Sequence, residues 1–435
     1  MKKRGCCTTQ NNLPIAFRAQ QGDGKQARNE EKIDEARQAC LESMQQGLKK
    51  IILIHYGEIA LKGKNRYEFE NRLVKNIFIA LRGIEYDGIL KKDSRIVIGL
   101  TDKSDIQEMK IRLKKVFGIE WLSIAYETEK DVEKIKGAVL DYLANNAVPA
   151  PIKIEARRTD KKFKMNSMEI SSVVGKAIDE KGFETDLENQ KTTIRISILN
   201  KSAVISFERI DGQGGLPIGS AGRVLCLLSG GIDSPVAVLQ MMRRGCNVDL
   251  LHFYQFASHE EVLKSKIMEI VDVLKGYGFA GTLYLAPYSK FYQATFTSIP
   301  PKKELVVFRR FMLKVANQIA RETQAKGIAT GDNLAQVASQ TLDNLYVTDE
   351  ASEFPVYRPL ISHDKREIID LARKYGTYDA SIREYKDCCS LVAVKHPETK
   401  TKLEEIKLLE ENAGIEKIVE ETIKEIVVIK IEATE

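Results

Sequence analysis

One stretch of this 435-residue chain constrains its fold more than any other: Leu227-Leu228-Ser229-Gly230-Gly231-Ile232-Asp233-Ser234-Pro235. It continues the apolar run Val224–Leu228, which is typical of strands buried in parallel sheets. Gly230 and Gly231 let the backbone approach a ligand closely, and Pro235 suits the first turn of a helix. The stretch predicts a strand, a tight loop and a helix whose N-terminus can receive a phosphate group.

The polar residues of this loop suit phosphate and metal chemistry. Ser229 and Ser234 supply hydroxyl groups, and Asp233 is a candidate magnesium ligand, directly or through water. The lysine of a G-x-x-x-x-G-K-[ST] phosphate loop is missing. An ordinary glycine-rich turn is the alternative, but the complete Ser-Gly-Gly-Ile-Asp-Ser string after an apolar strand favours nucleotide binding.

Strand and helix patterns alternate through the C-terminal half of the chain. Such alternation predicts a doubly wound α/β domain with a parallel sheet. We expect strands at 224–228, 248–253, 282–286 and 327–330, and helices at 234–244, 259–276, 303–325 and 365–375.

The N-terminal half predicts two smaller α+β units. Apolar residues at helical spacing indicate a helix over 67–81, between short strands at 51–54 and 95–100. In the second unit we expect strands at 121–127, 152–158, 193–199 and 203–209, and helices at 130–145 and 167–182.

These patterns divide the chain into six parts. A polar N-terminal extension is expected to be disordered, and Met44 is an alternative start of the protein. A cluster of glycines predicts a flexible connector before the nucleotide-binding domain. The expected parts are the extension 1–47, the α+β units 48–105 and 106–211, the linker 212–223, the catalytic α/β domain 224–402 and a charged tail 403–435.

Composition excludes some classes of protein and leaves others open. The net charge of +6 is compatible with an RNA partner, and equally with a slightly basic cytoplasmic enzyme. An odd number of cysteines, seven, with two adjacent pairs, indicates a reducing cytoplasmic compartment rather than a disulfide framework. No apolar run reaches the length of a membrane span, and the N-terminus lacks the apolar segment of a secretory signal.

The loop string resembles the PP-loop of ATP pyrophosphatases, and other segments narrow the resemblance to one family. Taken in chain order, they resemble the ThiI family of tRNA 4-thiouridine synthases. The segments are Tyr56–Arg66, Glu155–Lys161 with Asn166–Ile170, Thr330–Leu342, and Asp387–Ser390 with Lys395–Pro397. The resemblance implies a ferredoxin-like domain and a THUMP RNA-binding domain, both α+β, followed by a doubly wound PP-loop domain.

The family's chemistry implies ATP and Mg²⁺ as reactants at the PP-loop. The resemblance implies that the enzyme adenylates the base oxygen of uridine at position eight of tRNA and then replaces that oxygen with sulfur. Arg309 could offer its charge to the triphosphate. His252 is equally a strand-end core residue or a nucleotide contact. The expected ATP-binding residues are Leu227, Leu228, Ser229, Gly230, Gly231, Asp233, Ser234, His252, Phe253, Arg309, Gly331 and Gln340.

The family's catalytic-domain cysteine falls where Cys388 and Cys389 stand, with Cys389 favoured. A reactive thiolate needs nearby positive charge, for which Lys386 and Lys395 are candidates, whereas two small buried residues are the structural alternative. The resemblance is to a short form of the family, without the rhodanese domain that long members carry. A cysteine desulfurase or other persulfide donor is therefore expected in trans, and the thiamine sulfur-carrier protein is a further possible partner. No iron–sulfur cluster is expected, because the other cysteines lack the C-x-x-C spacing.

Two basic clusters suit phosphate contacts with tRNA, and solvated charged faces are the alternative for each. They contain Lys62, Lys64 and Arg66, and Arg157, Arg158, Lys161 and Lys162. A homodimer is possible. The competing functions are another PP-loop tRNA-modifying enzyme, such as a 2-thiolase, and a THUMP RNA-binding protein without activity.

Overall fold

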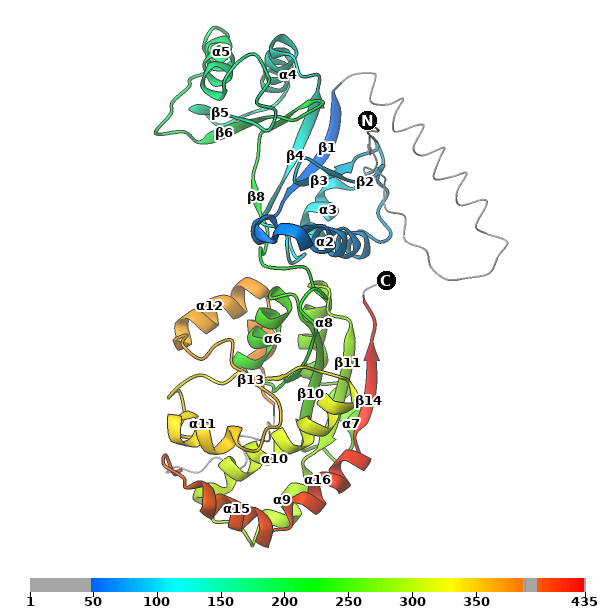
Figure 1. Cartoon of the computed structure of the whole chain (residues 1–435), viewed down its shortest axis with the longest axis vertical. Coiled ribbons are helices and arrows are strands. Elements are labelled where there is room, and N and C mark those ends of the chain that lie inside the picture. Colours follow the sequence, from blue (N-terminus) through cyan, green and yellow to red (C-terminus); the bar gives the residue numbers. More distant parts are fainter. Residues whose placement is uncertain (1–47, 386–387, 389–396, 434–435) are drawn as a thin grey trace, which may run out of the picture. The chain divides into compact units, whose positions relative to one another are not determined.

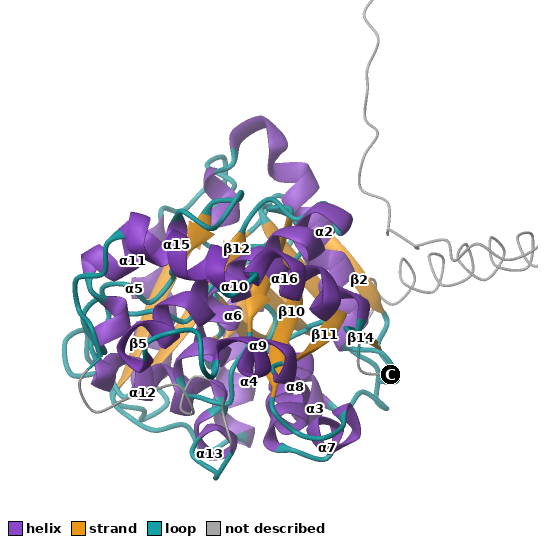
Figure 2. Ribbon diagram, turned by 90° about the horizontal axis from the view of Figure 1, so that it is seen from below, coloured by secondary structure: helices purple, strands orange, loops and turns teal. Residues whose placement is uncertain are grey.

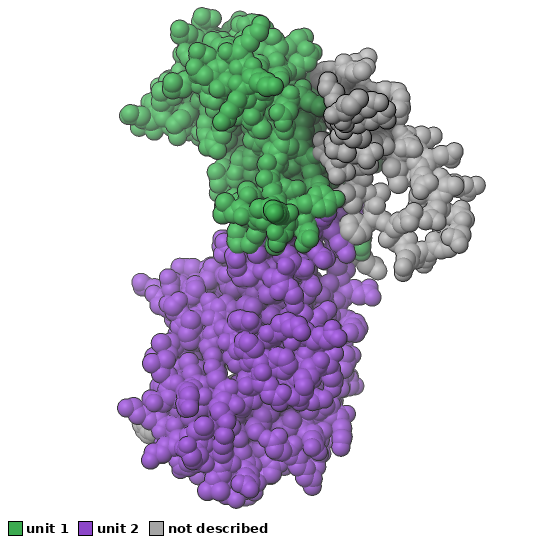
Figure 3. Space-filling model, viewed as in Figure 1, with its two compact units in different colours: residues 1–70, 81–114, 118–214 green, residues 71–80, 115–117, 215–435 purple. Residues whose placement is uncertain are grey.

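The computed structural model describes residues 48–385, 388 and 397–433, and these form two compact units (Figure 3). The first unit comprises the described residues up to Glu70, with Leu81–Lys114 and Gly118–Gly214. The second comprises Asn71–Ala80, Lys115–Phe117 and the described residues from Gly215 onward. The expected polar extension 1–47 lies outside the described residues.

The first unit is built on one eight-stranded sheet with the strand order β2-β3-β1-β4-β7-β6-β5, in which β8 also pairs with β4. All its strand pairs are antiparallel except β5 with β6. The strands are β1 Lys49–His55, β2 Gly88–Lys92, β3 Arg95–Gly99, β4 Trp121–Thr128, β5 Ile152–Arg158, β6 Thr192–Ile198, β7 Ala203–Ser206 and β8 Ile210–Asp211. The helices are η1 Glu58–Leu61, η2 Gly63–Asn65, α2 Arg66–Ala80, α3 Ile106–Leu113, α4 Val132–Asn145 and α5 Ser167–Asp179.

Strand β4 joins the two α+β units that the sequence pattern separates. On one side it pairs with β1, placing Ile52 opposite Ile124, and on the other with β7, placing Ala125 opposite Ser206. The expected α+β units 48–105 and 106–211 therefore share one continuous sheet within the first compact unit. The strand expected at 203–209 is shorter, because β7 ends at Ser206 and the separate strand β8 pairs with β4.

The second unit contains a six-stranded sheet with the order β13-β12-β9-β10-β11-β14 (Figure 1). Its strand pairs are parallel except β11 with β14. The strands are β9 Arg223–Leu227, β10 Asn247–Tyr254, β11 Gly281–Pro287, β12 Ile328–Ala329, β13 Val356–Tyr357 and β14 Val427–Ile431. The helices are α6 Asp233–Arg243, α7 His259–Leu263, α8 Lys266–Gly276, α9 Ser289–Thr295, α10 Pro301–Glu322, η3 Ala338–Gln340, α11 Leu342–Asp349, α12 Lys365–Tyr375, α13 Tyr378–Ser381, α15 Leu403–Asn412 and α16 Ile415–Lys424.

Helices cover both faces of this sheet, which confirms the doubly wound prediction (Figure 2). Along β9, Cys226 joins an apolar cluster with α6 and α8, while Leu225 joins a second cluster with α10 and α16. Neighbouring residues of a strand point to opposite faces, so both faces need an apolar cover. Where a single helix is expected at 259–276 there are two, because α7 ends at Leu263 and the hydroxyl of Ser265 caps the start of α8.

Two segments are more ordered than the sequence pattern indicates. The expected charged tail 403–435 forms α15, α16 and β14, and β14 pairs with β11, so the tail completes the second unit's sheet. Its apolar residues, among them Ile415 and Val419, pack in the core. The end of the glycine-rich connector is also fixed. Leu216 N donates to Arg243 O at 2.9 Å, and Gly219 N donates to Gly245 O at 2.8 Å.

Candidate active site

Hydroxyl groups fix the shape of the glycine-rich loop between β9 and α6. The backbone N–H of Ser229 donates to Ser234 Oγ at 2.8 Å, and that of Gly231 donates to Ser229 Oγ at 3.2 Å. The two serine hydroxyls also lie 3.0 Å apart. The N-terminus of α6 is thereby held behind a preformed loop, an arrangement that suits an anion.

The end of β12 comes into contact with this loop. A Cβ on Gly331 would lie 2.7 Å from the backbone nitrogen of Ser234 and 2.8 Å from its Cα. Only glycine allows this approach, because real Cβ contacts are not that short. Gly331 and Ser234, both expected to bind ATP, therefore lie side by side although they are 97 positions apart in the sequence.

Asp332 is the hub of a charged network beside the loop. Its carboxylate accepts hydrogen bonds from Arg309, from Thr330 Oγ1 at 2.9 Å, from Arg358 Nε at 3.2 Å and from Gln340 Nε2 at 3.3 Å. Burial alone would raise the pKa of Asp332, but the two arginine charges and the Thr330 hydrogen bond outweigh it and hold that pKa below its ordinary value. Asp332 is therefore an anion that orients Arg309 and Gln340.

Two glutamine carbonyls in this region lack protein partners. Gln336 Oε1 and Gln340 Oε1 are buried, and neither finds a hydrogen-bond donor in the part of the chain that the structure describes. Buried acceptors without donors are unfavourable, so a bound molecule with N–H or O–H groups would stabilise them. The amino group and ribose hydroxyls of a nucleoside have this chemistry.

Asp233, the first residue of α6, accepts hydrogen bonds from two residues that are distant in the sequence. Its Oδ1 accepts from Lys365 Nζ at 2.7 Å and its Oδ2 from Gln336 Nε2 at 3.0 Å. Among the described residues no three acidic, histidine or cysteine side chains gather in the manner of a metal site. One carboxylate beside a phosphate-binding loop nevertheless fits Mg²⁺, which commonly takes one or two carboxylates together with substrate phosphates.

His252 is a buried residue at the end of β10 that contacts the loop. Its Nδ1 lies 2.8 Å from Leu228 O and its Nε2 lies 2.7 Å from the Tyr385 hydroxyl. Because a carbonyl oxygen only accepts, Nδ1 carries the proton and Nε2 accepts from Tyr385. The side chain thus serves the core and braces the loop at once, and the neighbouring Phe253 is also buried.

Of the two adjacent cysteines, the structure describes only Cys388. Cys388 is buried in the apolar cluster around α10, and its Sγ donates to Phe253 O at 3.3 Å. Cys389 and the candidate cations Lys386 and Lys395 lie outside the described residues. Burial raises the pKa of the Cys226 and Cys246 thiols, as expected for core residues rather than nucleophiles.

The first basic cluster lies on η1, η2 and the start of α2 in the first unit. Arg66 is held by neighbours, because its Nε donates to Glu70 at 2.8 Å and its second nitrogen to the Tyr56 hydroxyl at 2.5 Å. Lys62 forms a 3.5 Å ion pair with Glu58. Lys64 is exposed. Lys62 and Lys64 are therefore the members of the cluster most available to a partner.

The second cluster begins on β5 and divides between two faces of the sheet. Arg157 has a side chain 78% exposed, whereas Arg158 donates to Phe163 O at 3.1 Å and to Met165 O at 3.0 Å. Arg158 therefore holds the loop after β5, while Arg157, Lys161 and Lys162 face solvent to differing degrees. Alternation along the strand gives adjacent arginines these different positions.

Three arginines near this cluster escape a search for runs of charge, because they stand on separate strands or in loops. Pairing of β1 with β3 and β4 places Arg95 and Trp121 next to His55, whose ring stacks on Trp121 with centroids 3.6 Å apart. Arg209 lies over the ring of Trp121, with its Cζ 5.3 Å from the centroid of that ring. Burial and the charges of Arg95, Arg157, Arg209 and Arg195 lower the pKa of His55 to about 3. Arg195 stands between two buried isoleucines of β6, and this alternation is a sequence signal that could have indicated its place on the more exposed face of the strand.

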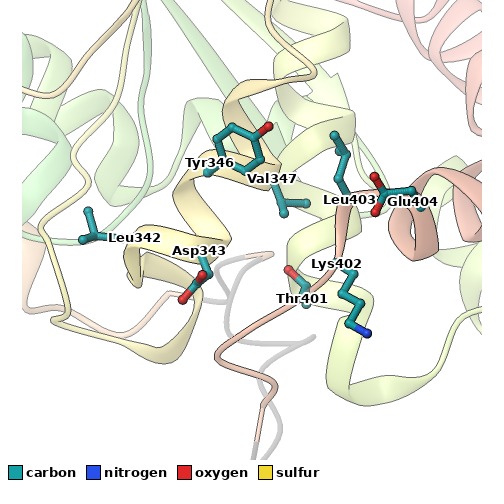
Figure 4. A pocket seen from close by; sticks show the side chains of 8 residues that line it. All are labelled: Leu342, Asp343, Tyr346, Val347, Thr401, Lys402, Leu403 and Glu404. Atoms are coloured by element: carbon teal, nitrogen blue, oxygen red, sulfur yellow. The ribbon is translucent and has the colours of Figure 1, made fainter.

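A surface cavity of about 400 Å³ lies between α11 and the start of α15 (Figure 4). None of the residues expected to bind ATP lines it. Its walls are Leu342, Asp343, Tyr346, Val347, Thr401, Lys402, Leu403 and Glu404. The nucleotide loop is therefore a separate site.

Three protein families match successive parts of the chain. Residues 51–123 match the ThiI ferredoxin-like domain, residues 129–208 match the THUMP domain, and residues 219–415 match the family described as thiamine biosynthesis protein (ThiI). No described helix combines the length and the apolar character needed to cross a membrane.

Curated relatives match over nearly their whole length. The probable tRNA sulfurtransferase of Caldanaerobacter subterraneus subsp. tengcongensis is 40% identical over 382 residues, which is 87% of this chain and 100% of the relative. The probable tRNA sulfurtransferase of Thermoanaerobacter pseudethanolicus is 38% identical, over 87% of this chain and 99% of the relative.

Solved structures agree with these matches. A 4-thiouridine synthetase in complex with RNA and bound ATP is 31% identical, with a TM-score of 0.77, and the match covers 88% of this chain and 100% of that one. The protein PH1313 from Pyrococcus horikoshii is 27% identical, with a TM-score of 0.59, over 75% of this chain and 99% of that one.

Proposed function

The chain belongs to the ThiI family of tRNA sulfurtransferases, and we propose that it uses ATP to convert uridine at position eight of tRNA into 4-thiouridine. The observation that carries this proposal is the meeting of the Ser-Gly-Gly-Ile-Asp-Ser loop with Gly331 and the Asp332 network at one end of the parallel sheet. Ligands of open α/β sheets bind at the carboxyl ends of the strands, where these residues lie.

The first half of the reaction activates the base. The uridine O4 attacks the α-phosphorus of ATP, a bond forms between O4 and phosphorus, and pyrophosphate leaves as the N3 proton is lost. The loop and the α6 N-terminus hold phosphate oxygens, and Arg309, oriented by Asp332, supplies positive charge. A magnesium ion held by Asp233 and the phosphates would neutralise the charge that develops on pyrophosphate. Lys365 would then contribute its charge to the phosphates, because it shares Asp233.

The second half replaces oxygen with sulfur. The terminal sulfur of a cysteine persulfide attacks C4, the C4–O bond breaks, and AMP leaves with the oxygen. A second thiolate, from an external thiol, then attacks the cysteine sulfur of the new disulfide, which releases the 4-thiolated base and leaves a mixed disulfide that a further external thiol reduces. We assign the persulfide to Cys389, because the thiol of Cys388 is buried and donates to Phe253 O. A cysteine desulfurase or another persulfide donor supplies the sulfur in trans.

The first unit binds tRNA in this proposal. Arg157, Lys161 and Lys162 contact phosphates, and the arginines around the His55–Trp121 stack extend the same positive surface. Phosphate contacts of this kind fix the register of the RNA, while the chemistry takes place in the second unit. The enzyme works in the cytoplasm, where tRNA and reduced thiols are available.

Replacement of Asp233 tests the activation step. Asp233→Ala should lower tRNA-dependent exchange of pyrophosphate into ATP at least about a hundredfold, because the residue serves the charged transition state. Binding of tRNA should be nearly unchanged. The matched control is Asp272→Ala, which removes an exposed carboxylate on α8. Wild-type exchange by the Asp233 variant would overturn the assignment of the loop.

Single replacements of the adjacent cysteines test the sulfur step. Cys389→Ser should retain pyrophosphate exchange and lose persulfide-dependent formation of 4-thiouridine. Cys388→Ser should retain both, with a modest loss of stability. Nucleoside analysis of tRNA from a deletion strain that carries each variant gives the same comparison in cells. If both variants, and the double variant, thiolate tRNA at the wild-type rate, another thiol is the sulfur carrier.

A further inference from the structure

Gln336, a residue outside the expected ATP-binding set, joins the segment after β12 to the start of α6. Its Nε2 donates to Asp233 Oδ2 at 3.0 Å, across 103 positions of sequence. The side chain is half-buried, and Oε1 is buried without a hydrogen-bond donor among the residues that the structure describes. One end of the amide is therefore bonded within the protein, while the other end is left to accept from a bound molecule.

The backbone beside Gln336 has a conformation that few residues other than glycine adopt. Ala335 has a φ of 61°, in the left-handed region. Its N–H donates to Gln340 O at 2.9 Å, and the N–H of Gln340 donates to Val337 O at 2.9 Å, so the turn is closed from both sides. Such a conformation is unfavourable and persists only where the surrounding structure holds it, as at functional sites. The turn thus fixes Gln336 against Asp233.

The two donors to Asp233 differ in charge and in exposure. Lys365 donates to Oδ1 at 2.7 Å, and its positively charged side chain is 45% exposed. Gln336 is neutral and is held by the closed turn. A neutral donor orients a carboxylate without cancelling its negative charge, whereas a cation in the same place would weaken the attraction of that carboxylate for a metal ion. Gln336 therefore fixes Asp233 and leaves it able to bind a cation.

We infer that Gln336 is a positioning residue for the magnesium ion of the bound nucleotide: Nε2 holds Asp233, and Oε1 accepts a hydrogen bond from a water molecule of that ion. This inference rests on the proposed function, in which Asp233 is a magnesium ligand. Mg²⁺ in nucleotide sites keeps several waters and takes one or two carboxylates. Loss of a side chain that hydrogen-bonds to a ligating carboxylate typically costs about ten- to a hundredfold in metal affinity.

The test measures how far magnesium strengthens nucleotide binding. The full-length enzyme is titrated by calorimetry with the α,β-methylene analogue of ATP, once with Mg²⁺ and once with EDTA. Gln336→Leu removes both polar ends of the side chain, and Gln336→Lys keeps a donor but adds a positive charge. The matched control is Gln318→Leu on α10, where an exposed glutamine donates to Glu322 at the same distance of 3.0 Å. Thermal unfolding confirms that each variant is folded.

The expected result is an effect that depends on the metal. Gln336→Leu should weaken binding of the analogue at least about tenfold with Mg²⁺ and less than about twofold with EDTA. The Mg²⁺ concentration for half-maximal tRNA-dependent pyrophosphate exchange should rise by about the same tenfold factor, with a much smaller fall in the rate at saturating Mg²⁺. Gln336→Lys should bind the analogue about equally with and without Mg²⁺, because its charge neutralises Asp233. The control should behave as wild type.

Three results would overturn the inference. Equal weakening with Mg²⁺ and with EDTA would show that Gln336 only supports the fold of the turn. Wild-type strengthening by Mg²⁺ in Gln336→Leu would show that Asp233 needs no such partner, and the same result in Gln336→Lys would show that the charge of this side chain does not reach the metal. The proposed function fails separately, if the wild-type enzyme shows magnesium-dependent nucleotide binding but no tRNA-dependent pyrophosphate exchange.

Discussion

Two groups of arginines in this protein, one in each unit, have opposite roles. In the first unit Arg157, one of the arginines around His55, has a side chain 78% exposed. In the second unit Arg310 is 1% exposed, and its guanidinium holds Glu410 through two hydrogen bonds of 2.8 and 3.0 Å. Exposed charges attract a polyanion in a salt-dependent way, whereas buried charges must be paired and therefore fix geometry.

This difference separates charges that are available to bind RNA from charges that hold other side chains in place. Arg309 and Arg358 converge on Asp332 beside the nucleotide loop, so one buried anion sets the positions of two cations. The surroundings of His55 show the opposite situation: burial first, and then the charges of Arg95, Arg157, Arg209 and Arg195, lower its pKa, so that several positive charges surround a neutral ring. A gathering of like charges is unfavourable in the protein alone and suits a surface that receives phosphates.

The largest effect expected from this comparison is on the stability of the second unit. Asp332→Asn removes the buried anion that Arg309 and Arg358 share, although Arg358 keeps its ion pair with Asp349, and should lower the free energy of unfolding by about 3–5 kcal/mol. Urea unfolding followed by far-ultraviolet circular dichroism measures it. The control, Glu155→Gln beside Arg157 in the first unit, should cost less than about 1 kcal/mol because that pair is at the surface.

The acid side of the stability profile gives a second reading of the same carboxylate. Because the folded-state pKa of Asp332 lies below its ordinary value, the contribution of Asp332 to stability is complete above the unfolded pKa of about 3.9 and is lost as pH falls through the folded value. The Asn variant should lack this acid-dependent component. An equal acid sensitivity in both proteins would show that Asp332 is not the anion of the network.

An intermediate effect is expected on RNA binding. The double change Arg157→Ala and Lys161→Ala should weaken tRNA binding and reduce the slope of log affinity against log salt by about two, since each lost phosphate contact removes about 0.9. Titration of labelled tRNA at several salt concentrations measures the slope. Arg321→Ala, which removes an exposed arginine of α10 in the second unit, is the control and should leave the slope unchanged. A slope that is also unchanged in the double variant would remove this face from the RNA surface.

The smallest effect concerns the pH dependence of the first unit. His55 has a folded-state pKa of about 3, below its ordinary value of 6.5, so the unfolded chain takes up a proton first. The contribution of this group is complete well above pH 6.5 and is lost as pH falls through 6.5, and this loss should lower stability by about 1.4 kcal/mol at pH 5.5. Trp121 is the one tryptophan of the chain and lies on His55, so its fluorescence follows the unfolding of this unit.

His55→Gln is the variant that isolates this residue. It should flatten the pH dependence of the urea midpoint between pH 7 and 5.5 when Trp121 fluorescence is followed. A midpoint that moves equally with pH in wild type and variant would mean that another group titrates in this range.

The sequence by itself determined the features that depend on neighbours along the chain. The loop at 229–234 is recognisable because glycines, serines and an aspartate must follow one another in a fixed order to form a phosphate-binding turn. Helix α12 was predicted with its observed bounds, since a capping box at Asp364 and Glu367 and a left-handed Gly376 punctuate it locally. The parallel sheet follows from alternating apolar strands and amphipathic helices.

Only the tertiary structure decided which distant residues meet. Asp332 stood in a recognised segment, but its partners Arg309 and Arg358 lie 23 and 26 residues away. The burial of Cys388 against Phe253 likewise could not be predicted from the sequence. The segment 403–435 was predicted to be a charged tail because its many charges stand out in the sequence. Its apolar stripe has a partner only in the folded protein, where α15 and α16 pack in the core and β14 pairs with β11. Periodicity reports the face of one element, whereas the partner of that face is fixed by the fold as a whole.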